Sequence, residues 1–66
     1  MTIHVDARGL RCPWPVLRLA RAMRETDAVT IQADDPAAPG EIRALARAQG
    51  WTAEESDGAF TVTRPR

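Results

Sequence analysis

The residue that could do chemistry in this chain is Cys12, which lies in the segment Arg-Cys-Pro-Trp-Pro at positions 11–15. It is the only cysteine, and His4 is the only histidine. The chain has no glycine-rich phosphate loop and no supported Ser-His-Asp set. One cysteine and one histidine cannot complete a four-ligand zinc site, so we expect neither a metal nor a cofactor. Any reaction is therefore expected to use the thiol of Cys12.

The position of Cys12 predicts an activated, solvent-accessible thiol. Pro13 suits the first position of a helix, which would make Cys12 the N-cap residue. A helix N-terminus carries partial positive charge, and Arg8 and Arg11 add more, so this position favours a thiolate. Without such a context a lone cysteine is usually an inert apolar side chain.

The two prolines beside Cys12 predict a stiff platform for its sulfur. Pro13 and Pro15 fix the backbone of the first helical turn and remove two N–H donors. The amide of Trp14 then remains as the main hydrogen-bond donor to the sulfur. We therefore expect Pro13 and Pro15, together with Arg11, to support Cys12. A simple helix start is the alternative interpretation.

The helix that follows Cys12 is predicted to have one buried and one exposed face. At about 100° per residue, the buried stripe consists of Val16, Leu19, Ala20 and Met23. The side opposite to this stripe carries Trp14, Leu17, Arg18 and Arg21. An exposed tryptophan next to arginines is typical of a protein interface, so we expect these four residues to bind a partner. A solvated helix face is the alternative.

The residues that a self-sufficient thiol enzyme needs are missing. No second cysteine can resolve an oxidised Cys12, and the sequence offers no convincing general base. A thiol without these groups can accept a chemical group and hand it on by exchange. The sequence therefore indicates a carrier whose partners complete the chemistry.

Hydrophobic periodicity and turn residues predict six elements. They are a strand over 2–6, a helix from 13 to about 25, a strand over 28–33, a helix over 39–49, and strands over 51–56 and 59–64. The order βαβαββ predicts an α/β (α+β) two-layer sandwich, with two helices packed on one face of a mixed four-stranded sheet. The first two strands should be parallel because a helix joins them. Asp57-Gly58 predicts a hairpin between the last two.

The same patterns predict which side chains form the core. On the strands the core should contain Val29, Ile31, Ala33, Phe60 and Val62. On the second helix it should contain Ile42, Leu45 and Ala46, and Gly50 should end that helix. The other sheet face should be open to solvent, with His4, Thr30, Gln32, Thr61 and Thr63 pointing outward. Between strand and helix, Asp34-Asp35-Pro36 should break the strand and place carboxylates near the helix start.

Length and composition predict a single domain over residues 1–66. A chain of 66 residues buries only about 60% of its unfolded surface, so the core is small. No apolar run approaches the about 18 residues of a membrane span, and no secretory signal is visible. A single cysteine forms no internal disulfide, which agrees with a reducing cytoplasm. We also expect a monomer with no membrane partner.

The net charge of zero conceals an uneven distribution. Residues 1–24 carry a net charge of +4 and residues 25–63 a net charge of −6. The basic N-terminal part could meet an acidic protein surface. Direct binding of nucleic acid is not expected, because interleaved aromatic residues and net positive charge are both absent.

Three segments give the chain a family resemblance. They are residues 6–15, Asp-Ala-Arg-Gly-Leu-Arg-Cys-Pro-Trp-Pro, then 33–37, Ala-Asp-Asp-Pro-Ala, and 49–51, Gln-Gly-Trp. Together they resemble the TusA/SirA-like sulfur-carrier family, whose signature is Cys-Pro-x-Pro after Gly-Leu-x. The resemblance spans nearly the whole chain. The chain departs from the usual family pattern at Trp14, Glu41 and Pro39-Gly40.

The resemblance implies a βαβαββ sandwich and a role for Cys12. In this family the cysteine accepts sulfur as a persulfide from a cysteine desulfurase or another persulfide donor, and passes it to a cysteine of a downstream acceptor protein. Such a protein is a sulfurtransferase that acts as a carrier rather than as a self-sufficient catalyst. Members serve tRNA thiolation, cofactor synthesis or sulfur oxidation.

Two other functions agree with the same residues. The chain could be a non-catalytic interaction or regulatory module that docks through its basic first helix. It could also be a one-cysteine redox sensor, which, like a carrier, would need an exposed thiol of low pKa.

Overall fold

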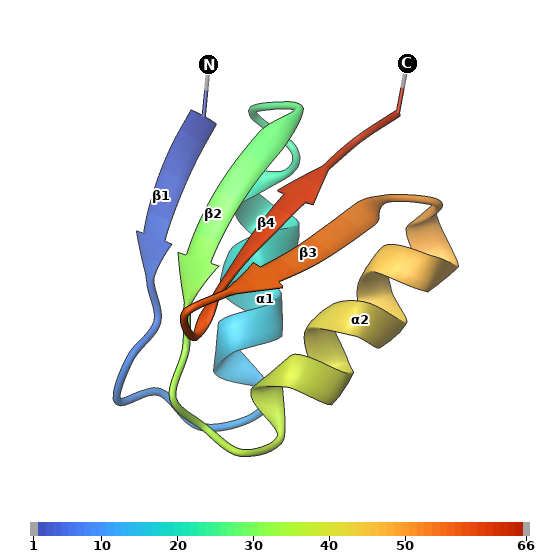
Figure 1. The fold of residues 1–66 in the computed structure, drawn as a ribbon. Helices are drawn as coiled ribbons and strands as arrows, with labels where there is room; N and C mark the ends of the chain where they lie inside the picture. The colour runs from blue at the N-terminus through green and yellow to red at the C-terminus, as the bar shows by residue number, and fades with distance from the viewer. Residues whose placement is uncertain (1, 66) are drawn as a thin grey trace.

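The computed structural model describes residues 2–65 and has the predicted order βαβαββ (Figure 1). The elements are β1 (Thr2–Asp6), α1 (Trp14–Ala22), β2 (Ala28–Gln32), α2 (Ala38–Gln49), β3 (Thr52–Ser56) and β4 (Ala59–Thr63). Both helices lie on the same face of the sheet, so the two-layer α+β architecture is confirmed.

The four strands form one mixed sheet in the order β1-β2-β4-β3. β1 and β2 are parallel, as expected for strands joined by a helix, while β4 is antiparallel to both β2 and β3. The β3–β4 hairpin turns at Asp57 and Gly58, whose φ angles are +50° and +77°. Two positive φ angles in succession are what a tight two-residue hairpin of type I′ requires.

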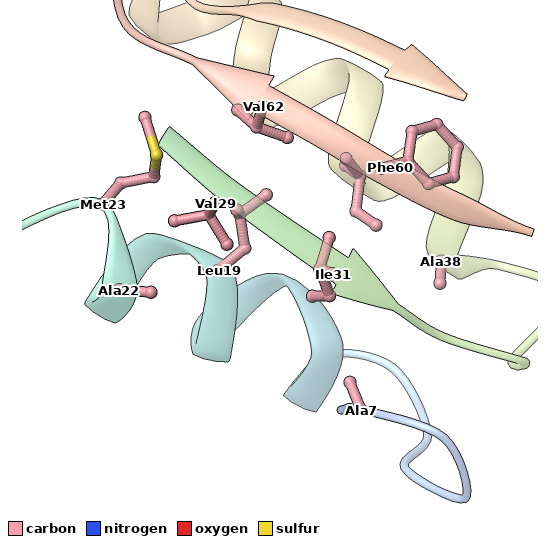
Figure 2. Packing of buried hydrophobic residues seen from close by; sticks show 10 residues of the cluster. Ala7, Leu19, Ala22, Met23, Val29, Ile31, Ala38, Phe60 and Val62 are labelled. Carbon is pink, nitrogen blue, oxygen red and sulfur yellow. The ribbon is translucent and has the colours of Figure 1, made fainter. Parts of the chain in front are cut away.

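The core lies between the helical layer and one face of the sheet (Figure 2). Leu19 of α1 and Met23, which directly follows that helix, lie in one cluster with Val29 and Ile31 of β2. β4 adds Phe60 and Val62 to this cluster. The predicted strand core is confirmed, with Ala33 half-buried against it. On the open face, His4 pairs in register with Thr30, which pairs with Thr61.

α1 differs from the prediction at both ends. It begins at Trp14 rather than Pro13 and ends at Ala22 rather than near Glu25. After Ala22 the chain tightens, and the amides of Arg24 and Glu25 donate to carbonyls three residues earlier, at 3.2 and 3.0 Å. Arg64 also donates to the carbonyl of Met23 at this end.

The buried stripe of α1 also differs in part. Leu19 and Met23 are buried as predicted, whereas Val16 and Ala20 are half-buried. Pro15 and Ala22, which were not part of the predicted stripe, are also buried. Because Pro15 lies one turn before Leu19, the stripe runs closer to the N-terminal end of the helix than predicted.

Backbone hydrogen bonds at the two ends of α2 explain where this helix begins and ends. The amide of Ala38 donates to the carbonyl of Asp35 at 2.9 Å, so the helix begins one residue before the predicted start. Gly50, with φ +76°, ends it as predicted.

The strand boundaries also differ slightly from the prediction. The amide of Trp51 donates to the carbonyl of Ala46 at 2.8 Å, which leaves Trp51 outside β3. β2 and β4 are likewise each one residue shorter than predicted.

Candidate functional site

The loops that follow β1 and β2 lie side by side at one end of the sheet, where both helices begin (Figure 1). They are hydrogen-bonded to each other, because the amide of Gly9 donates to Oδ1 of Asp34 at 2.9 Å and the amide of Cys12 donates to Oδ2 of Asp35 at 2.9 Å. The carboxyl ends of parallel strands share one edge of a sheet, and this is a common place for functional residues. The two aspartates therefore fix the backbone of the loop that carries Cys12.

Cys12 is exposed in this loop, as predicted, but it is not the N-cap of α1. Pro13 occupies the N-cap, so Cys12 is one residue farther from the helix. The amide of Trp14 donates to the carbonyl of Arg11 at 2.8 Å. The predicted hydrogen bond from that amide to the sulfur is wrong, because a turn over residues 11–14 already uses the donor.

The partner of the sulfur is a carboxylate from the second helix. Sγ of Cys12 donates to Oε1 of Glu41, in the first turn of α2, at 2.8 Å. On its other sides the sulfur borders a narrow hollow lined by Pro15, Val16 and Ala38. The thiol is thus held between the first turns of the two helices.

This environment raises the pKa of the Cys12 thiol above its ordinary value. The hydrogen bond to Glu41 is the main cause, followed by desolvation and by the negative charges of Glu41 and Asp35. The expectation of a thiol activated by the helix dipole is therefore wrong. A full negative charge in direct contact with the sulfur outweighs the partial charge of a helix end.

The arginines near Cys12 do not offset these carboxylates. Arg8 is held by Asp6, with its Nε and Nη2 at 2.9 and 3.0 Å from the two carboxylate oxygens. This pairing lowers the pKa of Asp6 to about 2. Arg11 is exposed on the turn before Cys12. Of the two arginines predicted to place positive charge around the thiol, Arg8 is thus paired with Asp6.

The two prolines have different surroundings. Pro13 is exposed, whereas the side chain of Pro15, at the second position of α1, is fully buried. Pro15 therefore belongs to the core as well as to the motif. Its ring links the position of the Cys12 loop to the packing of α1.

We expect Pro15→Ala to destabilise the fold, because the side chain of Pro15 is fully buried. Loss of two buried ring carbons should lower the free energy of unfolding by about 1–2 kcal/mol. Pro39→Ala is the matched control, because Pro39 also lies at the second position of its helix but is half-buried. Both changes add similar freedom to the unfolded chain. Equal losses in urea denaturation would contradict a packing role for Pro15.

The four side chains predicted to bind a partner are all exposed. Trp14 and Leu17 are 58% and 50% exposed and are the large apolar residues at the surface of the described chain. Arg18 and Arg21 are exposed on the same helix. The exposure is confirmed, and the binding role stays a prediction.

Sequence reasoning missed three acidic residues around Cys12, namely Asp34, Asp35 and Glu41. The two aspartates were expected to serve the start of α2, but their side chains bind the neighbouring loop. The predicted parallel pairing of β1 and β2 was a usable signal, since it places the loops after both strands together. Nothing in the helical periodicity indicated that Glu41 faces a thiol 29 residues away.

Two kinds of feature are absent from residues 2–65. Within these residues, no three His, Cys, Asp or Glu side chains are placed to share a metal ion. Neither helix of this described region has the length and apolar composition of a membrane span.

Over most of its length, this chain is similar to proteins whose names refer to sulfur transfer. A family model described as sulfurtransferase TusA matches residues 3–63. Two proteins from Neisseria meningitidis, serogroups A and B, named as sulfur carriers, are each 41% identical over 64 residues, covering 88% of this chain and 86% of the relative. A protein named as a sulfur carrier from Archaeoglobus fulgidus is 45% identical over 50 residues, covering 71% of this chain and 65% of that protein.

A solved structure agrees with this similarity. The crystal structure of a SirA-like protein from Desulfitobacterium hafniense matches with a TM-score of 0.75 and 28% identity, covering 96% of this chain and 93% of that one. The fold and the sequence thus lead to the same set of proteins.

Proposed function

The chain belongs to the TusA sulfurtransferase family, and we propose that it carries sulfur as a persulfide on Cys12. Membership implies that it interacts with proteins that donate and accept sulfur. The observation that supports Cys12 most strongly is that the only thiol of the chain is exposed on a loop fastened by Asp34 and Asp35.

The proposed reaction is an exchange between two cysteines. The sulfur of Cys12 attacks the outer sulfur of the donor's persulfide, the S–S bond of the donor breaks, and the donor cysteine leaves as a thiol with the proton from Cys12. No net oxidation takes place. Delivery repeats the same exchange with an acceptor cysteine, so the carrier needs an accessible sulfur more than a complete set of catalytic residues.

The other residues of the motif are proposed to support this exchange. Pro13 and Pro15 hold the chain around Cys12, and Arg11 lies on the adjacent turn. We propose a cysteine desulfurase or another persulfide donor as the source of sulfur and a downstream protein cysteine as its destination. The carrier is proposed to act as a monomer in a reducing compartment such as the cytoplasm, where a lone thiol stays reduced.

The exposed side of α1 is proposed to be the docking surface for these proteins. Trp14 and Leu17 offer apolar area beside the Cys12 loop. Arg18 and Arg21 offer positive charge that would attract an acidic partner surface in a salt-dependent way. Sulfur exchange requires two cysteines in contact, so a recognition surface near the thiol is needed.

A one-cysteine redox sensor is supported less well. Redox-sensing cysteines combine accessibility with a low pKa and often a second, resolving cysteine. The chain has no other cysteine that could resolve an oxidised Cys12. This observation favours the carrier, whereas the raised pKa of Cys12 bears equally on both functions.

The proposal is tested by incubating the protein with a cysteine desulfurase and cysteine and measuring its intact mass. We expect the mass to increase by one sulfur atom and to return to its original value after reduction. An interaction module would keep its original mass. A redox sensor would instead gain oxygen or form a mixed disulfide under oxidants, and absence of added sulfur would refute the carrier function.

A further inference from the structure

Among residues 2–65, the hydrogen-bond partner of the Cys12 sulfur is Glu41. Its Oε1 accepts the thiol proton at 2.8 Å, although the two residues belong to different elements. The ion pairs found among residues 2–65 involve Asp6, Glu55 and Asp27, so Glu41 is not neutralised by an arginine of the described chain. The negative charge of Glu41 therefore acts on the Cys12 sulfur without a paired cation among these residues.

The contact depends on the proton of the thiol. A carboxylate only accepts hydrogen bonds, so it attracts a neutral thiol and repels a negatively charged sulfur. Asp35, in the loop after β2, adds a second negative charge near the sulfur. Arg11 precedes Cys12 in its own loop and is the nearest cation along the chain. The empty and the loaded forms of Cys12 must therefore interact differently with α2.

We propose that Glu41 is a positioning residue that holds the empty Cys12 against α2 as a neutral thiol and repels the sulfur once it is loaded. The inference rests on the proposed carrier function. A persulfide is a stronger acid than the corresponding thiol, so the loaded Cys12 is carried as an anion with no proton to give to Glu41. Loading thus breaks the contact and turns the outer sulfur away from the carboxylate.

The loading reaction shows how this affects sulfur transfer. A neutral Cys12 thiol and a persulfide anion of the donor react to give a persulfide anion on Cys12 and a neutral donor thiol. Atoms, electrons and charge balance, and one proton moves from Cys12 to the donor cysteine. Because Glu41 stabilises the empty state and destabilises the loaded one, it biases the carrier toward giving sulfur away.

The experiment compares Glu41→Gln with wild type in the full chain, using iodoacetamide alkylation of Cys12 across a range of pH. Glutamine keeps an oxygen acceptor near the sulfur but removes the charge. Since that charge raises the pKa of Cys12, we expect the profile to move to lower pH and alkylation at neutral pH to become severalfold faster. Glu54→Gln, on the exposed open face of the sheet, is the control for net charge and should match wild type.

A second measurement examines the loaded state. Each protein is equilibrated with glutathione persulfide and glutathione, and the loaded fraction is read from intact mass. Glu41→Gln should hold severalfold more sulfur than wild type at the same ratio of the two reagents. Glu41→Asp, which keeps the charge on a side chain shorter by one methylene, should lie between them. This variant also supports the comparison if the glutamine variant folds poorly.

The outcomes separate this inference from the proposed function. If Glu41→Gln matches wild type in both measurements, or is alkylated more slowly, Glu41 does not restrain the thiol and the inference is overturned. If no variant accepts sulfur from glutathione persulfide or from a protein donor, the carrier function fails, and the role of Glu41 toward a loaded sulfur fails with it. The alkylation profile reports on Glu41 and the empty thiol in either case.

Discussion

Replacing Cys12 by serine is expected to abolish sulfur loading. The chain has no other cysteine, so the variant has no atom that can form a persulfide. Serine keeps the size of the side chain and a proton to donate to Glu41, so the loop and the fold should persist. Intact mass after incubation with the donor should show no added sulfur, while the circular dichroism spectrum stays that of wild type.

A relocated cysteine tests whether the position of Cys12 matters or only its thiol. Cys12→Ser combined with Ser56→Cys places a single cysteine at an exposed site at the end of β3, on the open face of the sheet. We expect this variant to react with iodoacetamide but to accept sulfur from a protein donor at least about tenfold more slowly, since the docking surface lies elsewhere. Added sulfur on the simple serine variant would contradict the assignment of Cys12.

Reversing the charge of the α1 surface is expected to slow sulfur transfer between proteins. Arg18→Glu with Arg21→Glu should reduce the transfer rate about tenfold at low salt, because charges at the edge of an interface mainly affect association. The difference should shrink as salt screens the charges. Alkylation of Cys12 by a neutral reagent should be nearly unchanged, since neither arginine contacts the sulfur.

The matched control carries the same change in charge away from the proposed surface. The control variant combines Arg24→Glu with Arg47→Glu, and both arginines are exposed. Arg24 follows the end of α1, and Arg47 lies in the last turn of α2. These positions are far along both helices from the end that holds Cys12. If both double variants transfer sulfur as wild type does at every salt concentration, the exposed face of α1 is only solvated.

Local patterns were sufficient to predict the fold. Alternation placed Val29, Ile31, Phe60 and Val62 in the core, and the Asp57-Gly58 turn defined the last hairpin. The element ends were less predictable, because they depend on hydrogen bonds that periodicity does not reveal. Trp51, for example, follows the apolar pattern of a strand but donates its amide to the cap of α2.

The candidate site was predicted only in part. The exposed cysteine and the exposed Trp14 follow from residue type and helical spacing, which are local properties. The pKa of Cys12 depends on Glu41, which reaches the sulfur only because α1 and α2 pack with their first turns together. The prediction based on the helix dipole and on Arg8 and Arg11 gave the wrong direction for the pKa, since it did not include the carboxylate of α2.

The central claim is that sulfur passes through Cys12, and a chase of labelled sulfur tests it most directly. The carrier is loaded with isotopically labelled sulfur from a desulfurase, freed from the donor, and mixed with a candidate acceptor protein. We predict that the label leaves Cys12 and appears as a persulfide on an acceptor cysteine at the same rate, with little free sulfide released. Label that stays on the carrier, or that leaves only as sulfide, with every acceptor tested would contradict the account.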